Sequence, residues 1–272
     1  MTKNLDKEGL KSIVDNYDLF FIDLWGVIHN GLDLYKNSIK VLNELTKLNK
    51  EYILLTNAPR PNVDVRSFVE KMGMDSKISS KVYTSGEAAL DYLIKNYKDK
   101  KFFHIGPPRD FGLFKTFEDS KIKEIYEAEY FLCTGLFDNQ DKELSFYNKL
   151  LTAHIKKIMV CTNPDLIVDR GKTREYCAGS VAKVFEKIGG KVEYFGKPYP
   201  KVYNQSTNVN DKKVLCIGDN LNTDIRGANF QNFYSLLISN GIHREEIKKN
   251  TITNLFNRYG VKVDFLQTNL KW

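Results

Sequence analysis

The chain has 272 residues, 42% of them hydrophobic, and a formal net charge of +7. A chain of this size can bury one large core, or a core domain together with a smaller one. The basic residues are spread along the whole sequence without a long run of like charges, which indicates a solvated surface rather than a nucleic-acid or membrane partner.

The first part of the chain alternates strands with helices. Residues 19–23 and 52–56 are short apolar runs that predict two buried strands. Asn37 or Ser38 can cap an amphipathic helix between them, and residues 63–72 predict a second helix that ends near a glycine. This order is typical of βαβ units.

A second βα series begins at about Thr84. It predicts helices over residues 85–97, 141–153 and 178–188, and strands over 102–105, 130–134 and 158–161. The chain then returns to a strand at 213–217, a helix at 222–230 and a strand at 233–238, and a helix or two follow Asn240. Together these elements predict an α/β fold with a doubly wound parallel sheet.

Three of the expected strands end in polar residues, at Asp23, at Thr56-Asn57 and at Asp219. In open α/β sheets, ligands bind outside the carboxyl ends of the strands. If these strands are neighbours in the sheet, we expect the three loops to converge on one site.

The residue types in these loops suit phosphoryl transfer, although each has a simpler explanation. Asp23 can attack phosphorus, or it can cap the following loop. Thr56 and Asn57 can hydrogen-bond phosphoryl oxygens, or they can form a turn. Lys197, held between Gly196 and Pro198, can neutralise both a phosphoryl group and the Asp23 carboxylate, or it can be one of many surface lysines.

Two further carboxylates follow the strand at 213–217. Asp219 and Asp224 stand five residues apart across a strand-to-helix turn. Mg²⁺ prefers oxygen ligands, commonly one or two carboxylates with water. The alternative is helix capping by Asn220 or Asn222, with no metal.

These segments, taken in order, resemble the four motifs of the haloacid dehalogenase superfamily of hydrolases. The matching stretches are Asp23-Leu24-Trp25-Gly26-Val27-Ile28, Leu55-Thr56-Asn57, Gly196-Lys197-Pro198, and Gly218-Asp219-Asn220 through Asp224. The long insert between the second and third stretches, which contains Thr162-Asn163-Pro164-Asp165, looks like the α/β cap of the class IIA branch. The resemblance implies a Rossmann-like core at 1–78 and 187–272, with the cap domain at 79–186.

The resemblance also implies an activity and roles for the residues. Members of this branch are mostly phosphatases of small phosphate esters such as sugar and nucleotide phosphates. Asp23 would be the nucleophile, and Thr56 and Lys197 would stabilise the phosphate. Mg²⁺ would be bound by Asp23, Asp219 and the backbone carbonyl of Trp25, with Asp224 as an outer or direct ligand. We also expect substrate contacts from Gly26, Asn57, Asn163 and Asp165, although the last two can instead form a structural turn.

One position departs from the phosphatase pattern. Phosphatases of this superfamily usually carry a second Asp two residues after the nucleophile, and this chain has Trp25 there. Indole cannot serve as a general acid or base, so we expect a slow enzyme or one restricted to good leaving groups. His29 is an alternative proton donor. Residues 169–171 can line the entrance of the site or form a solvated loop.

Two other functions remain open from the sequence. An aromatic residue after the nucleophile resembles the metal-independent dehalogenases of the superfamily, although Asp219 and Asp224 would have no use there. Loss of the acid also fits a protein that binds a phosphorylated metabolite without turnover. Four cysteines without a CxxC pair and a charged N-terminus favour a reducing cytoplasm. We expect a small phosphorylated metabolite as the partner, with neither nucleic acid nor membrane, and leave a homodimer open.

Overall fold

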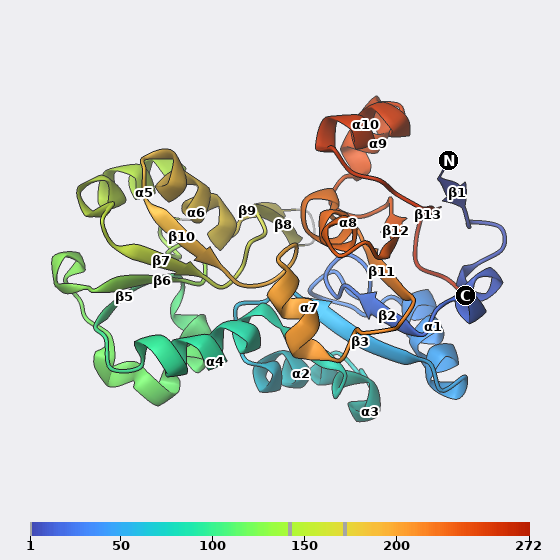
Figure 1. Ribbon diagram of the computed structural model, residues 1–272, viewed down its shortest axis with the longest axis horizontal. Coiled ribbons are helices and arrows are strands. Elements are labelled where there is room, and N and C mark those ends of the chain that lie inside the picture. Colours follow the sequence, from blue (N-terminus) through green and yellow to red (C-terminus); the bar gives the residue numbers. More distant parts are fainter. Residues whose placement is uncertain (1, 141–142, 171–172) are drawn as a thin grey trace.

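Two parallel sheets and one hairpin organise the chain in the computed structural model (Figure 1). The structure describes residues 2–140, 143–170 and 173–272. The larger sheet has seven strands, in the order β1 (Lys3–Asn4), β13 (Phe265–Gln267), β12 (Tyr234–Ile238), β11 (Val214–Gly218), β2 (Leu19–Ile22), β3 (Glu51–Thr56) and β4 (Val82–Thr84). The smaller sheet has four, β10 (Lys191–Tyr194), β7 (Ile158–Cys161), β6 (Tyr130–Cys133) and β5 (Phe102–Ile105). The hairpin pairs β8 (Ile167–Arg170) with β9 (Thr173–Tyr176) in antiparallel fashion.

The middle of the larger sheet is buried on both faces. β11, β2 and β3 are parallel neighbours, and all four residues of β2 are buried because helices cover both sides. Phe20 and Ile22 pack with α1 (Lys36–Lys47) and α2 (Asn62–Lys71). Leu19 and Phe21 pack on the opposite face with α4 (Ser85–Tyr97) and α7 (Pro200–Ser206). The predicted doubly wound parallel sheet is therefore confirmed.

The start of α1 differs from the expectation. Neither Asn37 nor Ser38 caps it, because the helix begins at Lys36, after Tyr35, and no side chain accepts a hydrogen bond at that end. The buried Ser38 hydroxyl instead donates to the carbonyl of Val27 at 2.7 Å. This bond ties the helix to the loop that follows β2.

The smaller sheet forms the core of the insert, on the left in Figure 1. α5 (Leu144–Leu151) and α6 (Ala178–Lys187) pack on one face of it, and α4 packs on the other. The helix predicted from residue 141 begins at Leu144 in the structure, and residues 141–142 lie outside the described part of the chain.

The chain passes from one sheet to the other later than the expected domain limits of 79 and 186. β4 belongs to the larger sheet, and β10 belongs to the smaller one. Both strands are short, and β10 alternates polar with apolar residues at the edge of its sheet. Neither therefore carries the continuous apolar run that predicts a buried strand.

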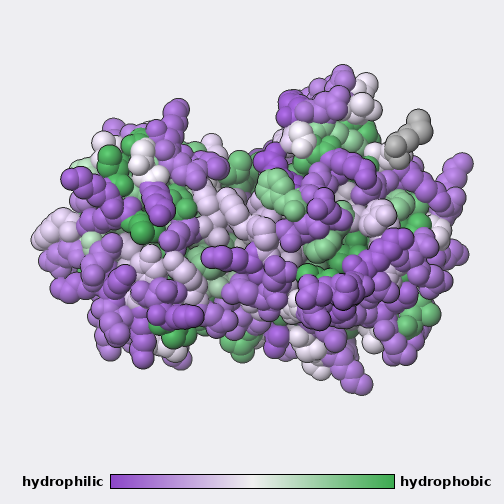
Figure 2. Space-filling view, viewed as in Figure 1, coloured by the Kyte–Doolittle hydropathy of each residue, from purple (hydrophilic) through white to green (hydrophobic). Residues whose placement is uncertain are grey.

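The remaining helices are short. They are α3 (Ser76–Ser79), a π-helix η7 (Leu221–Ile225), α8 (Arg226–Phe230), α9 (Arg244–Lys249) and α10 (Ile252–Tyr259), and the 3₁₀ turns η1 (Leu10–Ser12), η2 (Val14–Asn16), η3 (Pro108–Leu113), η4 (Lys115–Ser120), η5 (Ile125–Glu127) and η6 (Thr152–His154). No helix among the described residues has both the length and the apolar character that crossing a bilayer requires. Figure 2 shows a mostly hydrophilic face, with hydrophobic side chains in small groups.

Candidate active site

The expected convergence of strand ends is present in the structure. Because β11, β2 and β3 are parallel neighbours, the residues at their carboxyl ends lie together at one end of the larger sheet. These residues are Asp219, Asp23 and Thr56, and all three are buried. Sequence reasoning identified each of them from the polar residue that follows an apolar run.

Lys197 joins the acidic residues at this end of the sheet. Its Nζ donates to Asp23 Oδ1 at 2.5 Å, to Asp224 Oδ1 at 2.7 Å and to the carbonyl of Leu55 at 2.8 Å. Burial disfavours the ammonium, but the carboxylates of Asp224 and Asp23 outweigh that cost, and the pKa of Lys197 rises. The lysine is therefore a fixed positive charge beside the expected nucleophile.

Asn57 holds the backbone of Lys197. The Asn57 Oδ1 atom accepts from the Lys197 backbone N–H at 2.7 Å, and its Nδ2 atom donates to the Lys197 carbonyl at 3.0 Å. The same Nδ2 atom lies 3.2 Å from Asp165 Oδ1. Asn57 is not among the residues that line the site cavity, so the structure gives it contacts to the lysine loop in place of the predicted substrate contact.

Three carboxylates form a cluster suited to a divalent cation. One oxygen each from Asp23, Asp219 and Asp224 lie within 4.8 Å of one another, and all three residues are buried. Lys197 is the only cation paired with them among the described contacts. Burial and the neighbouring carboxylates raise the pKa of Asp219 well above its ordinary value. An all-oxygen donor set with uncompensated negative charge fits Mg²⁺.

The loop after Asp23 makes room for this cluster. Gly26 has a φ of +84°, and a Cβ atom there would lie 2.1 Å from Asp219 Oδ2. Only glycine adopts that backbone conformation readily and leaves that space empty. The Gly26 backbone therefore lies against the Asp219 carboxylate at the wall of the cavity.

Trp25 turns its indole toward the cap hairpin. Its Nε1 atom donates to the carbonyl of Asp169 in β8 at 2.7 Å. The expected alternative acid, His29, lies against the indole with ring centroids 5.1 Å apart, and its Nδ1 atom accepts from the Gly31 N–H at 3.0 Å. Burial lowers the pKa of His29 to about 4, and the residue does not line the cavity. His29 is therefore not placed to protonate a leaving group, which corrects that expectation.

These groups surround a cavity of about 310 Å³ between the larger sheet and the hairpin. Its wall includes the expected residues Asp23, Trp25, Gly26, Thr56, Asp165, Lys197, Asp219 and Asp224. Asn163 is absent from the wall, because its Oδ1 atom accepts from the Asp165 N–H at 3.0 Å in a local turn. For Asn163, the structure therefore shows the alternative prediction, a local turn.

The cavity wall also contains residues that sequence reasoning missed. They are Asn30, Tyr35, Ile167, Val168, Thr223, Asn240, Gly241, Ile242 and Arg244. Asn220, named from the sequence as a possible helix cap, also lines the wall, and its Oδ1 atom accepts from the Asn222 N–H at 2.9 Å as a cap does. Of the possible entrance loop at 169–171, Asp169 does line the cavity, and Gly171 lies outside the described residues. Asn240 lies two residues after β12, so a polar strand end was present there as at Asn57, whereas Arg244 lies further along the loop, where no strand-end signal applies.

The hairpin is bound to the core by a group of ion pairs. Asp169 accepts two hydrogen bonds from Arg174 of β9, at 2.8 and 3.1 Å, and one from Arg244 of the core at 2.6 Å. Arg174 also donates to the Ile242 carbonyl at 3.0 Å. The carboxylate of Asp169 consequently links both halves of the cavity.

Asp165 is a further acidic group in the wall. Burial raises its pKa to about 6, against the lowering effect of Lys197. This carboxyl therefore titrates close to neutral pH and faces the same cavity as Asp23.

Comparisons with known proteins agree with this architecture. A haloacid dehalogenase-like hydrolase model matches residues 20–120, and a HAD-hydrolase-like model matches residues 194–257. A crystal structure of a haloacid dehalogenase-like hydrolase from Brucella suis 1330 is 31% identical, with a TM-score of 0.79 over 87% of this chain and 94% of that one.

Curated relatives are more distant in sequence. An acid sugar phosphatase of Staphylococcus epidermidis is 24% identical over 77% of this chain and 82% of its own length. The ribonucleotide monophosphatase NagD of Escherichia coli K12 is 24% identical over 81% of this chain and 86% of its own length. The chain therefore belongs to the haloacid dehalogenase-like hydrolases, and its inserted α/β cap is that of their class IIA branch.

Proposed function

We propose that the chain is a Mg²⁺-dependent hydrolase of small phosphate esters, with Asp23 as the nucleophile. The observation that carries the proposal is the pairing of Lys197 with both Asp23 and Asp224, beside the third carboxylate of Asp219, inside a cavity. Phosphoryl transfer needs positioning and charge neutralisation more than covalent chemistry, and this arrangement supplies both.

In the proposed first step, a carboxylate oxygen of Asp23 attacks phosphorus in line with the ester oxygen. The bond to the ester oxygen breaks, an aspartyl-phosphate forms on Asp23, and the released alkoxide leaves and takes its proton from solvent water. Water then attacks the phosphorus, releases phosphate and restores the carboxylate. The Lys197 ammonium and the Thr56 hydroxyl offset charge on the phosphoryl oxygens.

Asp23, Asp219 and the Trp25 carbonyl would hold Mg²⁺, with Asp224 as an outer or direct ligand. Asp224 already accepts from Lys197 at 2.7 Å and from the Asn220 backbone N–H at 3.0 Å, which supports the outer role. Bound Mg²⁺ would neutralise the carboxylates and polarise a phosphoryl oxygen. The acidic cluster argues against metal-independent dehalogenation, which has no need of it.

Protonation of the leaving group is the step of the proposed mechanism that this site supports least. Trp25 takes the position of the usual acid, and its N–H is engaged by the Asp169 carbonyl. General acid catalysis typically contributes on the order of 10²–10⁴-fold. We therefore propose slow turnover, or a preference for esters whose alcohol leaves without a proton. The same observation favours the second candidate, a protein that binds a phosphorylated metabolite with little turnover.

The cavity and the relatives support a proposal for the substrate class. A volume of about 310 Å³ lies at the small end of ligand pockets. The relatives include a sugar phosphatase and a ribonucleotide monophosphatase. We propose a sugar or nucleotide phosphate, and a cytoplasmic protein in view of four free, buried cysteines. A homodimer remains a proposal that sedimentation would test.

The decisive experiment measures phosphate release from a panel of sugar and nucleotide phosphates, with Mg²⁺ and with EDTA. The Asp23→Asn variant should lose at least about 10³-fold in activity, because the amide cannot form the intermediate. Asp91→Asn, an exposed carboxylate of α4, is the control and should retain activity. Release that persists in Asp23→Asn or in EDTA would refute the mechanism, and tight binding of a panel member without release would favour the binding protein.

A further inference from the structure

The loop after β12 packs directly against Asp219. The backbone N–H of Ile242 donates to Asp219 Oδ2 at 2.8 Å. The preceding residue, Gly241, is so close that a Cβ atom there would lie 2.2 Å from the Cβ of Asp219. The position of the Asp219 carboxylate therefore depends on how this loop is held.

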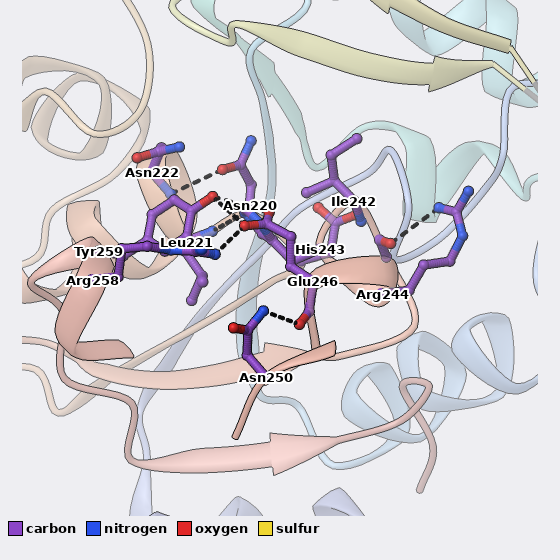
Figure 3. A network of polar contacts seen from close by, with 12 residues as sticks. Asn220, Leu221, Asn222, Ile242, His243, Arg244, Glu246, Asn250, Arg258 and Tyr259 are labelled. Atoms are coloured by element: carbon purple, nitrogen blue, oxygen red, sulfur yellow. Dashed lines mark hydrogen bonds and ion pairs between the residues drawn. The ribbon is translucent and has the colours of Figure 1, made fainter. Parts of the chain in front are cut away.

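His243, the next residue, connects the loop to the turn that carries the other acidic ligand. Its Nε2 atom lies 3.2 Å from the backbone nitrogen of Leu221. Leu221 is buried and begins the π-helix η7, which contains Asp224. Figure 3 shows His243 between the Asn220–Leu221 turn and Glu246.

The tautomer of His243 follows from its two partners. A backbone N–H can only donate, so Nε2 must be the unprotonated acceptor, and the ring proton sits on Nδ1. Nδ1 then donates to Glu246 Oε1, which lies 2.7 Å away. Burial also lowers the pKa of His243, which favours this neutral form.

Glu246 is itself fixed. It accepts from the hydroxyl of Tyr259 at 3.0 and 3.2 Å, and it pairs with Arg258. The Tyr259 ring packs edge-on against the imidazole, with centroids 4.9 Å apart. Figure 3 shows Arg258 and Tyr259, both of α10, beside Glu246 of α9. The imidazole consequently has one orientation, and it presents its acceptor to Leu221.

We propose that His243 is a positioning residue: by joining the Ile242 loop to the Leu221 turn, it fixes Asp219 relative to Asp224 and so sets the affinity of the acidic cluster for a divalent cation. The inference rests on the proposed function, because it concerns the same cation. Groups that orient metal ligands typically affect metal affinity by about 10–100-fold when removed. Nothing in the sequence pattern marked His243, since its partners lie on three separate segments.

Two substitutions at this position separate positioning from simple packing. His243→Leu keeps an apolar body and removes the acceptor. His243→Gln retains an acceptor oxygen at about the distance of Nε2. We expect His243→Leu to weaken Mg²⁺ binding about 10-fold or more by titration calorimetry, and His243→Gln to recover most of that loss.

The matched control is His104→Leu. His104 is a buried histidine of the cap whose Nε2 lies 2.9 Å from the Thr134 hydroxyl. Its loss should lower the melting temperature without changing the dissociation constant for Mg²⁺. An equal change in Mg²⁺ affinity in both leucine variants would show a general packing effect and overturn the inference.

If His243→Leu does not fold, Glu246→Met decides the question, because it removes the acceptor of the Nδ1 proton from a more exposed position. It should raise the Mg²⁺ dissociation constant severalfold, and an unchanged constant would overturn the inference. A wild-type protein that neither binds Mg²⁺ nor releases phosphate would instead refute the proposed function. A wild type that does both, with His243→Leu folded and binding Mg²⁺ equally well, would refute the role of His243 alone.

Discussion

Arg244, which follows the last core strand of the site, donates to Asp169 in the cap hairpin at 2.6 Å. The Asp169 carbonyl at the same time accepts from the indole of Trp25, two residues after the proposed nucleophile Asp23. One residue of the hairpin is thus bound by two parts of the core. The cavity wall formed by β8 is held against the core by these contacts.

Breaking the Arg244 contact should loosen the hairpin. We expect Arg244→Met to raise KM more than it lowers kcat. The partly exposed Arg244–Asp169 pair is worth about 1 kcal/mol, so its loss should also speed amide hydrogen exchange in β8 about fivefold. Arg174→Met should act in the same direction, because that side chain binds Asp169 and the Ile242 carbonyl. Arg109→Met, which removes an exposed pair with Asp138, is the control. Unchanged amide hydrogen exchange in β8 in both Arg244→Met and Arg174→Met would contradict the role of these arginines in holding the hairpin.

Gly26 tests the close approach to Asp219. Gly26→Ala should destabilise the fold by roughly 1–2 kcal/mol through its left-handed backbone, and should also weaken Mg²⁺ binding, because the new methyl group displaces the Asp219 carboxylate. Gly73 has a φ of +97°, and no atom lies within 4 Å of the position that a Cβ would take there. Gly73→Ala should therefore show the thermal destabilisation alone. Equal Mg²⁺ affinities in Gly26→Ala and Gly73→Ala would refute an effect of the close approach of Gly26 to Asp219 on Mg²⁺ binding.

The pH dependence of stability reports on the acidic cluster. Burial raises the pKa of Asp23 to about 8, above its ordinary value of 3.8. A carboxyl with a raised folded-state pKa binds its proton more tightly in the folded chain, so stability present at low pH is lost as pH rises toward 8. In EDTA, we expect the melting temperature to fall between pH 6.5 and 8. Each kcal/mol lost from the free energy of unfolding should lower it by about 2–4 °C.

Two comparisons isolate this effect. Mg²⁺ should flatten the slope, because the cation stabilises the ionised carboxylates. Asp23→Asn should reduce the slope without metal, while buried histidines contribute equally to both proteins and cancel in the difference. A wild type and an Asp23→Asn variant with parallel pH profiles in EDTA would contradict the assignment.

Leaving-group dependence tests the role of Trp25. The wild type should hydrolyse p-nitrophenyl phosphate at least about 10²-fold faster than an alkyl phosphate, because only the alkoxide needs a proton from an acid. Trp25→Asp should raise turnover of the alkyl ester about 10-fold and change the aryl ester little. Trp25→Phe, which also loses the bond to Asp169, is the control. Equal gains in both variants would show that release of the hairpin is responsible.

Much of the active site could be predicted from local sequence. Asp23, Thr56 and Asp219 each follow an apolar run, because a strand buried on both faces must be apolar and its end is the first place where a polar residue can meet ligand. The order of the four motif-like segments then indicated the family before any geometry was known. The alternation of strands and helices was enough to predict the doubly wound sheet.

Other features depended on contacts between distant segments. Asn57 directly follows Thr56 at the end of β3, yet its side chain binds the Lys197 backbone and does not line the cavity. The direction of the Asn57 side chain is set by the loop packed against it, 140 residues away in the chain. No local pattern records such a choice.

The sequence by itself determined the parallel core, the acidic strand ends and the tryptophan at position 25, because burial on both faces and the identity of a single residue are local properties. Only the tertiary structure decided that Trp25 and Arg244 bind the cap hairpin, and that His243 joins the Ile242 loop to the turn between Asp219 and Asp224. Those relationships arise from packing between segments far apart in the chain, where the cost of burying a polar group without a partner selects the neighbour.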